Sequence, residues 1–130
     1  MAQHPIEVIL TRQLAEYLVV PVFLVDPVGD LIFYNESAER ILGMRFDETG
    51  QMTAAVWSQH FKPTRPDGTA IPQDELPLVI SLNTGHPAVG KLGIIGADGV
   101  ARAIEVAAWP LVGLGDRKLG AVAMFWEIDP

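Results

Sequence analysis

The sequence predicts an α+β domain, with an amphipathic helix at the N-terminus, five segments of strand character and short helices between the second and third of these segments. Three observations predict this class. Apolar residues recur at helical spacing near the start of the chain. Two apolar runs of strand length follow, on either side of a Pro- and Gly-containing turn, and three more runs separated by hairpin signals fill the last third. With 130 residues, the chain has the length of a single domain that can bury its own core.

The N-terminal helix is expected over residues 6–18. Charged and polar residues occupy its other side, Pro5 suits a first helical turn, and Pro21 ends the segment. Its apolar side chains are Ile6, Ile9, Leu10, Leu14, Tyr17 and Leu18. We therefore divide the chain into residues 1–19, an amphipathic helix for dimerisation or capping, and residues 20–130, the sheet-containing domain.

A hairpin and a short capped helix follow in residues 22–43. The turn residues between Asp26 and Asp30 separate the two strands. Asn35 is expected to cap the helix over residues 36–42, because its side-chain oxygen can accept a hydrogen bond from the first helical turn. Gly43 suits the position just after that helix.

The middle of the chain is predicted to hold two helices separated by a loop. Thr53 can cap a short helix with an apolar stripe of Val56, Trp57, His60 and Phe61. Residues 62–72 contain three prolines and form the loop. A second helix is expected over residues 74–84, with Pro77 tolerated in its first turn and Gly85 after its end.

The last third predicts strands over residues 89–95, 102–109 and 119–126. The third strand is apolar on both faces, whereas an antiparallel strand with one solvated face would alternate apolar and polar residues. Both faces of the sheet must therefore be covered. The middle helices can cover one face, and the N-terminal helix or a second subunit can cover the other.

Composition excludes several kinds of chemistry. The chain has no cysteine, which removes disulfides, thiolate nucleophiles and cofactors attached through cysteine sulfur. The net charge of −7 disfavours nucleic acid as a partner. No secretory signal or membrane-spanning run is visible, so we expect a cytoplasmic protein without membrane contact. The three histidines, His4, His60 and His86, share no ligand spacing, and no metal site is expected.

An ordered set of segments resembles the PAS domain family over about residues 20–129, nearly the whole chain. The set is specific for the fold and weak for the ligand, because one fold serves many functions. The segments are Val22-Phe-Leu-Val-Asp-Pro-Val-Gly-Asp-Leu-Ile-Phe-Tyr-Asn-Glu-Ser-Ala-Glu-Arg-Ile-Leu-Gly43, the loop from Pro66 to Pro77, Ala97-Asp-Gly99, Ala107-Ala-Trp-Pro-Leu111, Leu119-Gly-Ala-Val-Ala-Met-Phe125, and Glu127-Ile-Asp129, where such domains pass to a signalling helix.

The resemblance implies a PAS-like five-stranded antiparallel sheet with short helices packed on one face. It also implies a sensory or signalling module that pairs with another domain or protein and often holds a small molecule. We do not expect an enzyme. Flavin and coumaroyl chromophores attached through cysteine are excluded here. Haem is not expected, because haem-binding members present a histidine from the long helix and residues 74–84 contain none. A non-covalent flavin stays open. The cofactor, the output partner and the signal are not determined, nor is whether the chain is free-standing or part of a larger sensor.

A ligand pocket is expected between the sheet and residues 53–84. Small residues on the C-terminal strands, opposite large ones on the helices, leave room for an apolar or aromatic ligand held without a covalent bond. Close packing of the same residues explains the pattern equally well. The candidate lining residues are Trp57, His60, Phe61, Val79, Leu82, Ala107 and Ala123. Ala103 and Ala121 belong to the same set of small strand residues.

Two other functions compete with ligand sensing. The first is a ligand-free module for protein interaction and dimerisation. The second is a small isomerase with an apolar cavity, for which Tyr17, Tyr34, Asp98 and Glu105 are the available acid–base groups. No nucleophile–base pair or acidic dyad stands out among them, so we assign no catalytic residue.

A homodimer is expected because one helix covers only part of a five-stranded sheet face, which would leave an exposed apolar patch. A two-fold symmetric pair would bury that patch and the apolar stripe of the N-terminal helix. The candidate contact residues are Ile6, Leu10, Leu14, Tyr17, Val122, Met124 and Trp126.

Overall fold

The computed structural model describes residues 4–128, so Asp129, the last residue of the expected signalling segment, lies outside the described residues. In chain order the elements are α1 (Ile6–Tyr17), β1 (Val22–Val25), β2 (Leu31–Tyr34), α2 (Glu36–Leu42), α3 (Phe46–Thr49), α4 (Ala54–His60), the 3-10 turn η1 (Gln73–Glu75), α5 (Pro77–Thr84), β3 (Ala88–Ile95), β4 (Ala101–Val112), the 3-10 turn η2 (Leu114–Asp116) and β5 (Lys118–Glu127).

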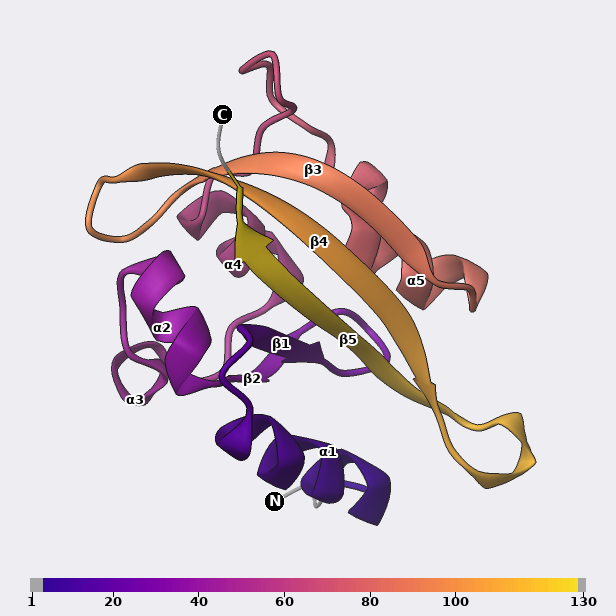
Figure 1. The fold of residues 1–130 in the computed structure, drawn as a ribbon. Helices are drawn as coiled ribbons and strands as arrows, with labels where there is room; N and C mark the ends of the chain where they lie inside the picture. The colour runs from indigo at the N-terminus through magenta and orange to yellow at the C-terminus, as the bar shows by residue number, and fades with distance from the viewer. Residues whose placement is uncertain (1–3, 129–130) are drawn as a thin grey trace.

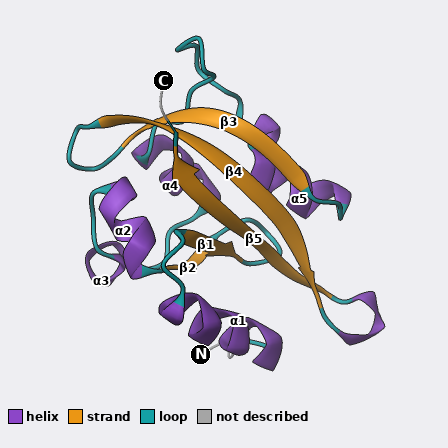
Figure 2. Cartoon of the chain, viewed as in Figure 1, coloured by secondary structure: helices purple, strands orange, loops and turns teal. Residues whose placement is uncertain are grey.

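The five strands form one sheet in the order β2-β1-β5-β4-β3, and every neighbouring pair is antiparallel. Figure 2 shows β3, β4 and β5 as long twisted strands beside the short β1 and β2. The predicted α+β class is therefore confirmed. Because β1 and β5 come from opposite ends of the sequence and pair at the centre, the two ends of the domain are held together.

The apolar residues on both faces of strand β5 are buried because other elements cover each face. Ala121, Ala123 and Phe125 belong to the cluster on the inner face, which α2, α4 and α5 cover. Val122 belongs to a second cluster on the outer face, which lies under α1. In Figure 1, α4 and α5 lie behind β3 and β4, whereas α1 lies apart from them at the bottom of the view.

Helix α1 uses its smaller apolar residues to contact the sheet. Only Val8 and Ala15 are buried among its residues. They pack with outer-face residues of β1, β2 and β5 that include Val22, Leu24 and Val122. The larger apolar side chains of the helix are exposed.

Proline explains one difference from the predicted helices. The helix expected from Asp74 instead begins at Pro77, after the separate 3-10 turn η1. Proline lacks an amide hydrogen and disfavours the helical conformation in the residue before it, and Leu76 is accordingly extended. Pro77 therefore occupies the first position of α5.

Strand β4 is longer than predicted and continues through Pro110 to Val112. Pairing with β3 ends at Ala108, so only β5 pairs with Pro110. A proline is tolerated there because one side of the strand is free of a neighbour. The short helix α3 was not predicted, because four residues are too few for a periodic pattern.

No helix in residues 4–128 is long and apolar enough to span a membrane.

Candidate functional site

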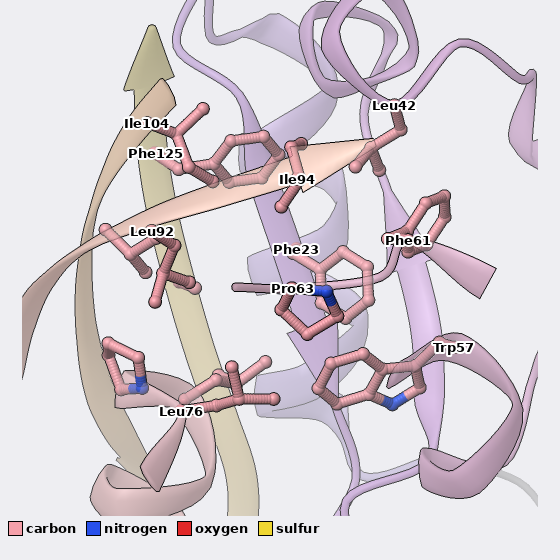
Figure 3. Close-up of a pocket in the computed structure, with 14 residues that line it drawn as sticks. Phe23, Leu42, Trp57, Phe61, Pro63, Leu76, Leu92, Ile94, Ile104 and Phe125 are labelled. Carbon is pink, nitrogen blue, oxygen red and sulfur yellow. The ribbon is translucent and has the colours of Figure 1, made fainter. Parts of the chain in front are cut away.

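A small apolar cavity lies between the inner face of the sheet, helix α4 and the start of α5. Its volume is about 80 Å³. Figure 3 shows rings from three separate segments around it, those of Phe23 on β1, Trp57 on α4 and Pro63 in the following loop. The full lining is Phe23, Leu42, Trp57, Phe61, Pro63, Leu76, Pro77, Leu78, Leu92, Ile94, Ile104, Val106, Ala123 and Phe125.

Helix α4 is placed so that its aromatic residues face the sheet. The Thr53 hydroxyl accepts a hydrogen bond from Val56 N at 3.4 Å, and Asp30 Oδ1 accepts one from Ala54 N at 3.0 Å. Trp57 Nε1 donates to the Gly29 carbonyl at 2.9 Å, which satisfies the one polar atom of the indole. The Trp57 ring then meets the Phe23 ring edge-on, with centroids 5.2 Å apart.

The structure brings three of the seven predicted pocket residues to this cavity, namely Trp57, Phe61 and Ala123. His60 is exposed, because Trp57 and Phe61 are four residues apart on the inner side of α4 and His60 lies off that side. Ala107 lies on the outer face of the sheet, where it pairs with Met124, whereas its neighbour Ala108 pairs with Ala123 on the inner face. Ala103 is likewise on the outer face.

Val79 and Leu82 line a different depression. It lies between the β1–β2 turn, the start of α4 and helix α5, and its lining also includes Val28, Gly29 and Ala54. These two residues pack against the inner-face cluster but do not line the apolar cavity, because Leu78, one position earlier than Val79, takes the fully buried side of α5 next to it.

Most of the cavity lining was not predicted. Phe23, Leu42 and Ile104 come from β1, α2 and β4, and they meet only in the folded chain. The one sequence signal that could have found them is strand alternation, because residues two apart share a face of the sheet. Applied to Ala123 and Phe125, it places both on the inner face, as the structure does.

The cavity offers no acid–base chemistry of its own. None of its lining residues has a titratable side chain. The groups considered for an isomerase are apart from it: Tyr17 is exposed, Glu105 lies on the outer sheet face, and Asp98 pairs with Arg102 at 3.1 Å in the β3–β4 turn. Hydrogen bonds from Arg102 and the Val100 amide lower the pKa of Asp98.

Tyr34 is fully buried, but its hydroxyl is already used. It donates to the Met44 carbonyl at 2.9 Å and lies 3.3 Å from Thr49 Oγ1. Burial raises the pKa of this phenol above its ordinary value, so Tyr34 stays protonated at neutral pH. We therefore assign it a structural role.

Metal ligands do not cluster either. Among residues 4–128, no three His, Asp or Glu side chains are placed to hold a metal ion. His60 packs its ring edge-on against Phe61, with centroids 5.0 Å apart, and His86 is exposed beyond α5.

The second candidate surface is an exposed apolar stripe on α1, which we call the α1 stripe. It consists of Ile6, Leu10, Leu14 and Tyr17. Leu14 is 62 % exposed and Tyr17 is 86 % exposed. Four large apolar side chains on one short helix exceed the scattered exposure that is normal for a protein surface.

The predicted outer-face contacts divide in two. Val122 is only 2 % exposed because α1 covers it, so it is not accessible to a partner, contrary to the prediction. Met124 is half-buried beside the same cluster, and Trp126 is partly exposed near the end of β5. The α1 stripe and Trp126 therefore remain as the exposed apolar residues of the predicted contact set.

Comparisons with known proteins agree on the architecture. No family model matches the sequence, and no curated protein is significantly similar to it. Solved PAS and LOV structures superpose on most of the chain. The PAS domain of nitrogen regulation protein NR(II) from Vibrio parahaemolyticus has a TM-score of 0.66 and 16 % identity, covering 92 % of this chain and 98 % of its own.

The PAS domain of BvgS from Bordetella pertussis has a TM-score of 0.62 and 14 % identity, covering 95 % of this chain and 87 % of its own. A Rhodobacter sphaeroides LOV protein has a TM-score of 0.74 and 15 % identity, covering 96 % of this chain and 69 % of its own. At such identities the likeness concerns the fold. The chain has the PAS fold.

Proposed function

We propose that this chain is a PAS-type sensory or signalling module that acts as a homodimer and passes its signal to a partner protein. Residues 1–19 would form the dimerisation element and residues 20–130 the sensory domain. The observation that carries the proposal is that α1 buries its smaller apolar side chains and exposes its larger ones. The helix buries Val8 and Ala15 against its own sheet and leaves the larger α1 stripe exposed.

A second copy of the chain is the occupant that best fits the α1 stripe. In a two-fold interface both copies use the same patch, so each side chain of the stripe is buried once in each copy. Burying one Leu or Ile side chain is worth about 1.5–3 kcal/mol, so the six Leu and Ile side chains that two stripes supply can offset the cost of association. The stripe carries no charge, so two copies meet without repulsion within it.

Dimerisation is tested by a charge in the stripe. We expect the unmodified chain to be a dimer by light scattering at tens of micromolar. Leu14→Asp should raise the dissociation constant about 100-fold or more, because two carboxylates would be buried in an apolar seam. Gln59→Asp is the matched control, since it adds the same charge to exposed α4 on the opposite side of the sheet. A monomeric unmodified chain would overturn the dimer proposal.

For the ligand, we propose a small apolar molecule of a few heavy atoms, held in the cavity without a covalent bond. An apolar cavity of about 150 Å³ in another protein stays dry and binds benzene or xenon. The cavity here is about 80 Å³, roughly half that size. A flavin, a haem or an aromatic ligand would therefore require α4 or α5 to move.

Xenon is the appropriate probe for a cavity of this size. We expect xenon to shift the methyl NMR signals of Leu92, Ile94 and Ile104, which line the cavity. Ala123→Val should weaken these shifts because it adds methyl groups to the lining. Ala107→Val, at the adjacent position on the outer face, should leave them unchanged.

A ligand-free interaction module is the second candidate, and the small cavity volume favours it. If xenon causes no shift at the cavity methyls while the chain still dimerises, the ligand proposal fails. The function would then rest on the α1 stripe alone.

A further inference from the structure

Asn35 makes an unusual number of hydrogen bonds for one buried side chain. It follows β2, precedes α2 and is 1 % exposed. Its Oδ1 accepts from Val22 N and Ala38 N, each at 3.0 Å. Its Nδ2 donates to the carbonyls of Ala15 and Val20, each at 2.9 Å, and lies 3.4 Å from that of Leu18.

The two ends of this amide serve different parts of the molecule. The oxygen joins β1 to α2, so it holds the domain core and acts as the N-cap that the sequence predicts. The nitrogen holds the last turn of α1 and the segment that leads from it to β1. Capping needs only an acceptor, so the cap role does not explain the two short bonds that the nitrogen donates or its longer contact with Leu18.

Among the described residues, the other polar contacts between α1 and the domain are long or exposed. Arg117 reaches Glu7 at 3.5 Å in an exposed pair, which contributes little to stability. The Arg12 guanidinium lies 4.5 Å from the centre of the Phe33 ring. Ser37 Oγ donates to the Leu18 carbonyl at 3.4 Å. Beside these, α1 is held by Val8 and Ala15 and by Asn35 Nδ2.

We infer that Asn35 is the positioning residue of the dimer interface: its Nδ2 fixes the C-terminal end of α1 on the domain and thereby sets how the α1 stripe is presented. The inference rests on the proposed homodimer. It predicts that α1 can be released while the sheet and α2 stay folded, because the two roles belong to different atoms of one side chain.

Asn35→Asp separates the two roles. The substitution keeps the shape and the accepting oxygen, but it places a second oxygen against the Ala15 and Val20 carbonyls. We expect amides of α1 to exchange with deuterium at least about tenfold faster in the full chain, because two short bonds are replaced by repulsion. Amides of β4 and β5 should keep their protection, and the dimer dissociation constant should rise at least about tenfold.

Two further variants make the result decisive. Ser37→Ala removes the long bond to Leu18 and should change α1 exchange less than Asn35→Asp does. Asn35→Ser is the variant to measure if the buried charge of Asn35→Asp prevents folding. Serine can still cap α2 but is too short to reach the Ala15 and Val20 carbonyls. Exchange that is unchanged in α1, or that rises equally in α1 and β5, overturns the inference.

The test also separates this inference from the proposed function. If the unmodified chain is monomeric, the homodimer fails, and the positioning of an interface fails with it. If the unmodified chain is a dimer and Asn35→Asp dimerises equally well, only the positioning role fails.

Discussion

Gly120→Ala is expected to lower the free energy of unfolding by about 4 kcal/mol or more. That is a large part of the total, which is roughly 5–15 kcal/mol for a typical domain. Gly120 has a φ of +135°, and a Cβ at this position would overlap the carbonyl oxygen of Val25. The obstacle is backbone, which no side-chain rotation can relieve. Because the contact lies between β1 and β5, the central pairing of the sheet would have to open. Urea unfolding followed by circular dichroism measures the loss.

Gly99→Ala is the control for this prediction. Gly99 also has a positive φ, +79°, but a Cβ there meets nothing within 4 Å. Gly99→Ala should lower the free energy of unfolding only by the cost of placing alanine in a left-handed conformation, about 1–2 kcal/mol. Equal losses at Gly99 and Gly120 would show that φ alone, and not the close approach to Val25, determines the effect.

Trp57→Ala is expected to cost about 3–5 kcal/mol, the usual range for removing a large buried aromatic side chain. The indole packs against Phe23 and borders the apolar cavity, so its removal enlarges a void that already measures about 80 Å³. The Gly29 carbonyl would also lose its hydrogen bond. Thermal unfolding without indole measures the loss of stability, and unfolding with added indole shows whether the enlarged void binds it. Indole should raise the melting temperature of this variant only.

Val56→Ala is the matched control on the same helix. Val56 is 49 % exposed and lies outside the cavity lining, so this change should stay within about 0.5 kcal/mol. A loss below 1 kcal/mol for Trp57→Ala would contradict the packing described here. Stability unaffected by indole would show that the enlarged void collapses.

Much of the fold follows from local chemistry. Proline, glycine and the capping residues Asn35 and Thr53 act within a few residues of their own position, so the ends of α2 and α4 were predictable. Prediction failed where a tertiary neighbour decides. Pro110 is accepted in β4 only because β3 has already ended there.

The cavity was predicted in part because its lining depends on register. Ala107 and Ala108 are equally small, yet they lie on opposite faces of the sheet. A one-residue difference in strand position reverses the face of a side chain. The short predicted strands did not determine that register, whereas the observed pairing of Ala108 with Ala123 does.

The sequence by itself determined the alternation of helices and strands, the need to cover both faces of β5 and the absence of cysteine chemistry, because these depend on residue type and local spacing. Only the tertiary structure decided that α1 turns Val8 and Ala15 toward the sheet, that Val122 is covered, and that the cavity is small. Periodicity shows that a helix has an apolar side, but burial depends on which distant surfaces meet it. Here the β1–β5 pairing forms the surface under α1, and the side-chain amide of Asn35 holds the end of α1 against the domain.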